Sequence, residues 1–282
     1  MHRFDPSAAG CGDAASLFLV HGSAVAGKSW NALAAPLRER GVVVIAPDRL
    51  GQAAGERWPA GRAMSFDAEA EHLGAALAAA PGPVHLFGHS YGGAVAMQMA
   101  LRWPERVARL TLYEPTRFAL LLEAGQPRGS AGREIHAIGH AAHEHAAAGR
   151  EAEAAALFVD YWSGAGTWAA MDTGRQQRLA PQMTKVGAEF LAAFADPLPL
   201  EAWRALEMPV LLLGGERSPA PVRAINVRLA SVLPRAASVT LPGIGHMGPM
   251  THADDVREWL PEAAWADAPT PMPAPAPASA MA

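Results

Sequence analysis

The stretch His85-Leu86-Phe87-Gly88-His89-Ser90-Tyr91-Gly92-Gly93 decides how the rest of the chain is interpreted. The apolar run 84–87 predicts a buried strand, and the Ala, Met and Val residues after the last glycine predict a helix. A single serine lies between them, flanked by glycines that lack the side chains a tight turn would exclude. Ser90 is therefore predicted to lie at a strained strand-to-helix turn, the context in which Gly-x-Ser-x-Gly presents a nucleophile.

Length and composition restrict the class of protein. The 282 residues suffice for one large core or for a core with an inserted subdomain, and 50% of them are hydrophobic. A formal net charge of -4 gives no footprint for nucleic acid or an anionic membrane. The single cysteine, Cys11, excludes an internal disulfide, and we find neither a secretory signal nor a membrane-spanning run. We expect a cytoplasmic protein with a small-molecule substrate and no nucleic-acid or membrane partner; the oligomeric state stays open.

Strands and helices alternate on both sides of the turn, which predicts a parallel sheet covered by helices on both faces. Strands are expected at 17–20, 42–46, 84–87, 108–113, 210–213 and 237–241. Helices are expected at 29–40, 66–80, 91–103 and 219–233, with a last one ending near residue 260. Ser65 is a suitable N-cap for the second of these helices.

The alternation lapses at residues 117–207, which contain several helix-like stretches and no convincing strand. We interpret this part as a helical lid inserted into a sheet domain formed by residues 1–116 and 208–262. Residues 263–282 are almost entirely Ala, Pro, Ser, Thr and Met, and are expected to form a disordered tail. The predicted fold class is α/β, with a mostly parallel central sheet flanked by helices and an inserted helical lid.

A serine hydroxyl becomes a good nucleophile only with a base in hydrogen-bond reach. His246 is the best candidate, because it lies in a Gly-rich loop directly after the last predicted strand. His89 lies within the turn, and we expect its side chain to point away from the nucleophile in a structural role. His252, in the final helical region, is a weaker alternative base.

With these features the sequence resembles the α/β-hydrolase superfamily over about residues 17–260. The matching motifs are His21-Gly22 after the first apolar strand, the turn around Ser90, and Gly245-His246-Met247, with the nucleophile before the histidine. The resemblance implies an oxyanion hole formed by the backbone N–H groups of Ser23 and Tyr91.

The acid that should orient the histidine departs from the usual pattern of the family. Similar enzymes carry an aspartate in the loop after the strand 210–213, where this chain has Ser218. Some members place the acid after the strand that follows the elbow helix, and Glu114 stands there. We favour Glu114 as the acid; Glu216 is the alternative, and a weak or absent acid is the third. A purely structural Glu114 could instead pair with Arg117.

Two other motifs point to different chemistry. The loop 22–29 satisfies G-x-x-x-x-G-K-[ST], which is typical of a nucleotide-binding P-loop. Trp30 directly after it fits the hydrolase pattern, however, and we expect Lys28 to be solvent-exposed at a helix start. His136, His140 and His143 share one face of a predicted helix and could bind zinc, although a solvated helix explains them as well. We therefore expect neither a catalytic metal nor a cofactor.

The sequence thus predicts a serine hydrolase that forms an acyl-enzyme, with Ser90 as nucleophile, His246 as base and Glu114 as acid. Aromatic and Met residues of the lid indicate a small, largely apolar carboxylic ester or lactone as substrate: Trp162, Trp168, Met171, Met183, Phe190 and Phe194. Two alternatives stay open. One is a carbon–carbon bond hydrolase of the same fold, and the other is a ligand-binding or sensor protein with weak catalysis.

Overall fold

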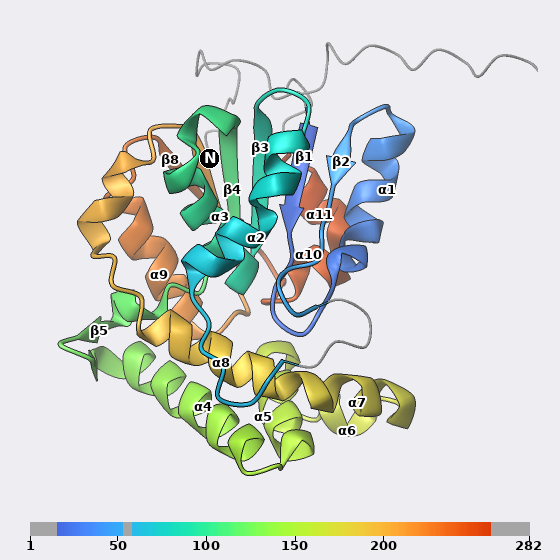
Figure 1. Ribbon diagram of the computed structural model, residues 1–282, viewed down its shortest axis with the longest axis vertical. Coiled ribbons are helices and arrows are strands. Elements are labelled where there is room, and N and C mark those ends of the chain that lie inside the picture. The colour runs from blue at the N-terminus through green and yellow to red at the C-terminus, as the bar shows by residue number, and fades with distance from the viewer. Residues whose placement is uncertain (1–15, 53–57, 261–282) are drawn as a thin grey trace, which may run out of the picture.

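A computed structural model describes residues 16–52 and 58–260, so Cys11 and the expected tail at 263–282 lie outside the described residues. Its central sheet has six parallel strands in the order β2-β1-β3-β4-β7-β8 (Figure 1). These are β1 (Ser16–Val20), β2 (Val44–Ile45), β3 (Val84–His89), β4 (Val107–Tyr113), β7 (Val210–Gly215) and β8 (Ala236–Leu241). No helix in the described parts is long and apolar enough to cross a membrane.

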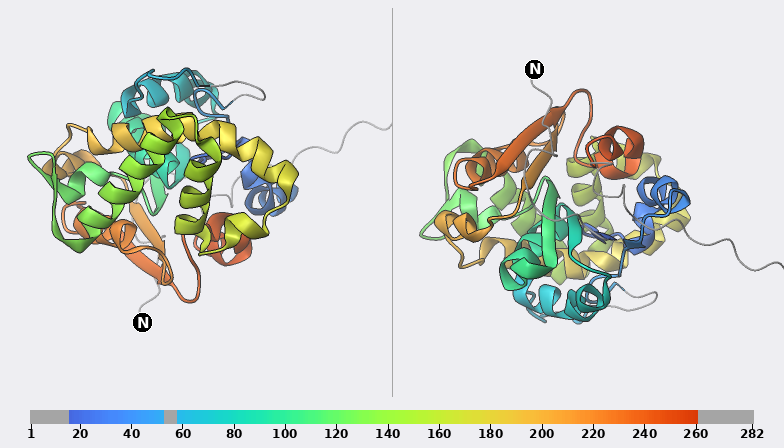
Figure 2. Two further views of the ribbon diagram at one scale, coloured as in Figure 1. Left: turned by 90° about the horizontal axis from the view of Figure 1, so that it is seen from below. Right: turned by 90° about the horizontal axis from the view of Figure 1, so that it is seen from above.

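The sheet is apolar on both faces because most of the buried side chains along its strands are apolar. Along β1, Leu17 and Leu19 pack with α1 (Asn31–Glu39), α10 (Gly248–Thr251) and α11 (Ala253–Arg257). Phe18 and Val20 point to the opposite face, which is covered by α2 (Phe66–Ala79), α3 (Tyr91–Arg102) and α9 (Ala220–Ala230). Figure 2 shows these two helical layers on either side of the strands. The predicted α/β fold class is confirmed.

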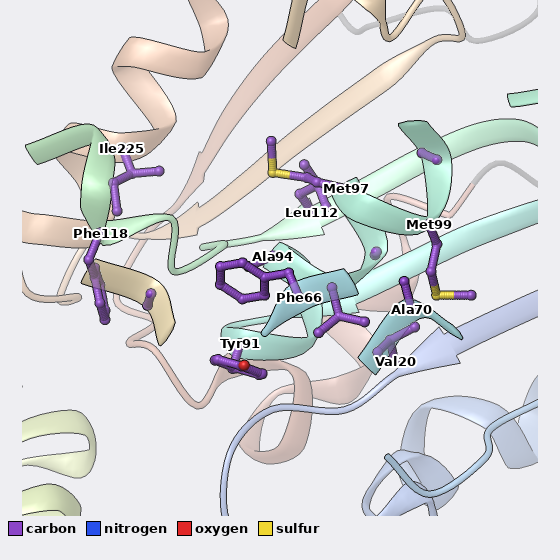
Figure 3. Packing of buried hydrophobic residues seen from close by; sticks show 14 of the residues in the cluster. Val20, Phe66, Ala70, Tyr91, Ala94, Met97, Met99, Leu112, Phe118 and Ile225 are labelled. Atoms are coloured by element: carbon purple, nitrogen blue, oxygen red, sulfur yellow. The ribbon is translucent and has the colours of Figure 1, made fainter. Parts of the chain in front are cut away.

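The layer formed by α2, α3 and α9 contains the apolar core that supports the strand-to-helix turn at Ser90. Phe66 at the start of α2 packs against Tyr91 at the start of α3, with ring centroids 5.0 Å apart. Figure 3 shows both rings with Val20 and Leu112 of the sheet in the same cluster. The turn is thus fixed on apolar side chains from both the sheet and a neighbouring helix.

Most expected elements form, with shifts at their ends. Ser65 caps α2 as predicted, because its hydroxyl accepts a hydrogen bond from the N–H of Ala68 (3.1 Å). β2 has only two residues and lies at the edge of the sheet, where it pairs with β1 alone. The expected last helix divides at His252, whose φ of −135° and ψ of 50° interrupt helical geometry between α10 and α11.

Residues 117–207 form a mainly helical insertion between β4 and β7, across the carboxyl ends of the strands (Figures 1 and 2). Its helices are α4 (Gly129–Ala147), α5 (Glu151–Ser163), α6 (Thr167–Ala170), α7 (Thr173–Leu179) and α8 (Met183–Phe194). Short 3₁₀ segments complete the described chain: Gly27–Trp30, Pro104–Arg106, Phe118–Leu121, Ala180–Gln182 and Leu200–Ala205.

The expectation of no strand in this insertion is wrong in one place. β5 (Leu122–Glu123) and β6 (Gln126–Pro127) form a small antiparallel hairpin. Ala124 and Gly125 connect them, and both have positive φ (49° and 77°), as a tight hairpin turn requires. Strands of two residues are too short to produce a recognisable alternation, so only the glycine hints at the turn.

Candidate active site

Ser90 occupies a turn whose geometry depends on the adjacent glycines. Its φ of 57° and ψ of −125° lie in a backbone region that residues other than glycine rarely adopt. A Cβ on Gly92 would lie 2.2 Å from the carbonyl oxygen of His21, and one on Gly88 would lie 2.5 Å from that of Gly92. The N–H of Ser90 donates to the carbonyl of Tyr113 (2.9 Å), which ties the turn to β4. The strained conformation is therefore fixed by close backbone packing.

His246 lies in the loop between β8 and α10, and two contacts fix this loop. The hydroxyl of Tyr113 donates to the carbonyl of Gly245 (2.8 Å). Nε2–H of His89 donates to the carbonyl of His246 (2.9 Å). Burial, and then the neighbouring His246, hold the pKa of His89 well below its usual value, so His89 is neutral. His89 thus supports the loop. His252 is exposed and contacts Thr251 rather than this site.

Glu114, His246 and Ser90 lie in one hydrogen-bonded chain at the carboxyl edge of the sheet. Nδ1 of His246 is 2.6 Å from Oε2 of Glu114, and Nε2 is 3.0 Å from Oγ of Ser90. All three residues are buried. The other carboxylate oxygen of Glu114 accepts the N–H of Gly215 (2.6 Å). Glu114 itself has a φ of 51°, so this carboxylate also comes from a strained backbone position.

Neither of the alternative acid positions, Glu216 and Ser218, takes part in this series of hydrogen bonds. The carboxylate of Glu216 is exposed and accepts the N–H of Gly243 (2.8 Å). Ser218 is buried, and its hydroxyl has no hydrogen-bond partner among the described residues. Arg117 pairs with Asp196 (2.6 Å), so the contact considered between Arg117 and the favoured acid does not form.

The loop that carries Ser23 is held by Arg49, a residue that the sequence did not single out. Nε of Arg49 donates to the carbonyl of His21 (2.9 Å), and Nη2 donates to that of Gly22 (3.1 Å). The backbone N–H of Arg49 donates to Nε2 of His21 (3.0 Å), which leaves Nδ1–H of that ring facing the carbonyl of Gly22 (2.9 Å). Burial, and next the charge of Arg49, lower the pKa of His21 to about 3.

Arg49 also belongs to a buried group of four charges that joins the sheet domain to the insertion. It donates to Glu69 of α2 (2.6 Å) and to Glu189 of α8 (2.8 Å). Lys185, one turn before Glu189, bonds the same carboxylate (2.7 Å) and approaches Glu69 (3.4 Å). Burial alone would raise the pKa of Glu189, but the charges of Arg49 and Lys185 lower it to about 2. Glu189 is therefore ionised at neutral pH.

A pocket lies beside Ser90, between the sheet and the insertion. Its volume of about 20 Å³ is room for roughly one water molecule. Trp162 of α5 lies against the ring of His246, with centroids 4.1 Å apart and the two planes tilted by 32°. Of the six aromatic and Met residues expected around the substrate, Trp162 and Phe190 line this pocket. Its apolar wall consists of Phe118, Phe158, Trp162, Val186 and Phe190.

Neither the P-loop-like segment 22–29 nor the histidine group on α4 is arranged as a binding site in the described residues. In the P-loop-like segment, the N–H of Gly27 donates to the carboxylate of Asp48 (2.7 Å), and Lys28 is exposed. On α4, the rings of His136 and His140 lie 4.2 Å apart, and both pack on Phe194. Among residues 16–52 and 58–260, no three or more His, Cys, Asp or Glu side chains gather in a way that could hold a metal ion.

A parallel sheet that presents Ser90 at a strand-to-helix turn, with a histidine from the last strand's loop against it, defines a class of hydrolases. The model of the alpha/beta hydrolase family matches residues 17–259, and the chain belongs to this family. A crystal structure of an alpha/beta hydrolase from Sphaerobacter thermophilus is similar in fold, with a TM-score of 0.59 and 23% identity. The match covers 89% of this chain and 94% of that one.

Two curated relatives are more similar in sequence but over shorter segments. Lipase LipV of Mycobacterium tuberculosis is 37% identical over 116 residues, which are 41% of each chain. A 2-hydroxymuconate semialdehyde hydrolase of a Pseudomonas species is 37% identical over 99 residues, 34% of this chain and 35% of that one. The matches therefore span well under half of either relative, and both relatives carry hydrolase activity in their names.

Proposed function

We propose that this protein is a serine hydrolase that forms an acyl-enzyme on Ser90 from a small, largely apolar carboxylic ester or lactone. The observation that carries this proposal is the continuous chain of short contacts from Glu114 through His246 to Ser90 (2.6 and 3.0 Å). A carboxylate, an imidazole and a hydroxyl in this order can activate the hydroxyl without a cofactor.

In the proposed reaction, Oγ of Ser90 attacks the ester carbonyl and its proton moves to Nε2 of His246. Glu114 stabilises the imidazolium that forms. The imidazolium then protonates the leaving alcohol oxygen as the ester C–O bond breaks, which leaves an acyl-serine. A water molecule gives its proton to Nε2 and attacks the acyl carbonyl, and the carboxylic acid is released as Ser90 regains its proton.

The surroundings of Ser90 support this chemistry. Tyr91 is the first residue of α3, so its N–H has no partner inside the helix and is available to a developing oxyanion. The loop of Ser23, which Arg49 holds in place, would supply the second N–H. The aromatic side chains over the pocket suit an apolar acyl or alcohol group, and the helical insertion acts as a lid.

A fluorophosphonate probe tests the proposal, because it reacts only with an activated serine. We expect stoichiometric labelling at Ser90 by peptide mapping, no labelling in Ser90→Ala, and at least about a hundredfold slower labelling in His246→Ala. Folded wild-type protein that remains unlabelled, and that hydrolyses no nitrophenyl ester, would instead point to a ligand-binding or sensor protein.

The second candidate is hydrolysis of a carbon–carbon bond in a β-diketone-type compound. One observation favours it: the 37% identity over 99 residues to a 2-hydroxymuconate semialdehyde hydrolase. The same serine and histidine would act in that reaction. Turnover of esters and of β-diketones by one preparation, compared as kcat/KM, decides between the two substrate classes.

A further inference from the structure

The pocket beside Ser90 has a polar side that the proposed mechanism does not use. Glu189, Tyr91 and Thr116 line the pocket together with the nucleophile. Each presents a buried polar atom, namely Oε2, the phenol oxygen and Oγ1 respectively, that has no hydrogen-bond partner among the described residues. Burying a polar atom without a partner costs free energy, so a polar substrate group that enters this pocket gains by bonding to these atoms.

These atoms are placed by the elements that build the active site. Tyr91 directly follows the nucleophile, and the N–H of Thr116 donates to the carbonyl of Ser90 (3.2 Å). Glu189 comes from α8 of the insertion, and its carboxylate also interacts with the hydroxyl of Ser23. Figure 3 shows Tyr91 at the edge of the labelled core cluster, below Phe66. A group bound by all three would therefore lie next to the reacting carbonyl.

The chemistry of the three atoms selects the group. Oε2 of Glu189 belongs to an ionised carboxylate, which only accepts hydrogen bonds, so a ligand group that bonds to it has to be a donor. Arg49 (2.8 Å) and Lys185 (2.7 Å) already neutralise this carboxylate, which removes the need for a further cation. An anionic group would face the carboxylate directly. A neutral hydroxyl fits, because it donates to Glu189 and accepts from the hydroxyls of Tyr91 and Thr116.

We infer that the substrate carries a neutral hydroxyl group close to its scissile carbonyl, bound by Glu189, Tyr91 and Thr116. The substrate class is thus a hydroxy-acyl ester or hydroxylated lactone whose remaining surface is apolar. This inference rests on the proposed serine hydrolase function and adds a specificity element to it. It also places the discrimination against carboxylate-bearing substrates at Glu189.

The test compares para-nitrophenyl esters of equal length: butanoate, its α-hydroxy and β-hydroxy derivatives, the β-amino derivative and the succinate half-ester. Each kcat/KM is divided by the rate constant for hydroxide hydrolysis of the same ester, which corrects for intrinsic reactivity. One hydroxy ester is expected to exceed butanoate by at least about tenfold, as a hydrogen bond to a charged acceptor allows. The ammonium and carboxylate esters are expected to fall below the hydroxy ester.

Three variants locate the effect. Thr116→Val and Tyr91→Phe should each lower the hydroxy-to-butanoate ratio by about fivefold, the worth of one neutral hydrogen bond. Glu189→Gln should lower it further, but this change also disturbs Arg49 and is interpreted only if the variant folds. Thr240→Val, on the exposed side of β8, is the matched control and should keep the ratio. Neither hydroxyl deletion should lower the melting temperature, because neither hydroxyl has a protein partner.

The outcomes separate this inference from the proposed function. If Ser90 is labelled but the corrected ratio is one or less, or if it is unchanged in all three variants, the hydroxyl site is wrong and the hydrolase stands. Recognition is also measured without chemistry, by titrating Ser90→Ala with the anilides of butanoic and hydroxybutanoic acid. Equal affinities overturn the hydroxyl site, and tighter binding of a hydroxy anilide supports it even if Ser90 proves inert.

Discussion

Glu114→Gln is the most direct test of the acid assignment, and the structure gives its consequence in detail. In the wild type, the two carboxylate oxygens accept from His246 Nδ1 (2.6 Å) and from the N–H of Gly215 (2.6 Å). A glutamine has one acceptor oxygen and one NH₂ group, so it can satisfy only one of these donors. If it keeps Gly215, its NH₂ faces Nδ1 and favours the tautomer with the proton on Nε2. That tautomer cannot accept the proton of Ser90.

The magnitude follows from the loss of both roles of the carboxylate. Glutamine neither holds the reactive tautomer nor stabilises the buried imidazolium, and the comparable acid-to-amide change in a serine triad lowers kcat by about ten-thousandfold. We expect a loss in kcat/KM of about three to four powers of ten, or roughly 4–5.5 kcal/mol of transition-state stabilisation. Glu216→Gln should change kcat/KM by less than about twofold, because an exposed amide oxygen can accept the same N–H.

The assay is hydrolysis of para-nitrophenyl butanoate by wild type, Glu114→Gln and Glu216→Gln, with the rate of fluorophosphonate labelling as a second readout. Both rates should fall together in Glu114→Gln, since both need the base. Thermal melting establishes that each variant is folded. A folded Glu114→Gln variant that retains more than about a tenth of wild-type activity would refute the assignment, as would an equal loss in Glu216→Gln.

Three further changes test the site and the fold. Trp162→Leu should lower kcat/KM by about 2–30-fold, because an aromatic face over His246 attracts the imidazolium and an aliphatic side chain does not. Trp162→Phe keeps an aromatic face and should lower kcat/KM by less. Equal losses in the two variants would exclude this role. Burial lowers the pKa of His85 from 6.5 to about 3. As the pH falls, the imidazole of His85 is therefore protonated in the unfolded chain before it is protonated in the folded one. The stability that is present above pH 6.5 is lost progressively toward pH 3. His85→Gln should therefore reduce the pH dependence of the unfolding free energy by up to about 1.4 kcal/mol per pH unit, measured by urea unfolding; an unchanged slope would contradict this. Gly92→Ala should destabilise the folded protein by at least about 2 kcal/mol or prevent folding, since its Cβ would lie 2.2 Å from the carbonyl oxygen of His21. Gly245→Ala is the control: its Cβ would meet nothing within 4 Å, so this variant should melt close to wild type.

The sequence predicted those features that local patterns encode. The strand, glycines and helix around Ser90 lie within one short stretch, and the loop of His246 directly follows a strand. Because parallel strands end at the same edge of a sheet, both residues could be placed at one site before any distance was known. Glu114 was proposed as the acid from the resemblance to family members that place it after this strand, once Ser218 was found in the usual acid position.

The supporting contacts were not predictable, because they join distant parts of the chain. Arg49 and Glu189 are separated by 140 positions, and Arg49 lies outside every strand and helix that the sequence predicts. The spacing of Lys185 and Glu189 indicates an ion pair on one helix face, but it does not indicate that both are buried. Nor could the sequence show that Trp162, rather than Trp168, lies over His246.

The position of Glu114, the proposed acid, is better understood in space than along the chain. β4 and β7 are neighbours in the sheet, and the N–H of Glu114 donates to the carbonyl of Leu213 at the end of β7 (3.1 Å). The carboxylate of Glu114 then reaches back across this strand end to Gly215 (2.6 Å), beside the loop of Ser218. An acid on either strand could thus serve the same imidazole nitrogen, and the glutamate side chain, one methylene longer than that of aspartate, reaches it from β4. The requirement is a carboxylate at one point of the sheet edge, and neighbouring strands can both meet it.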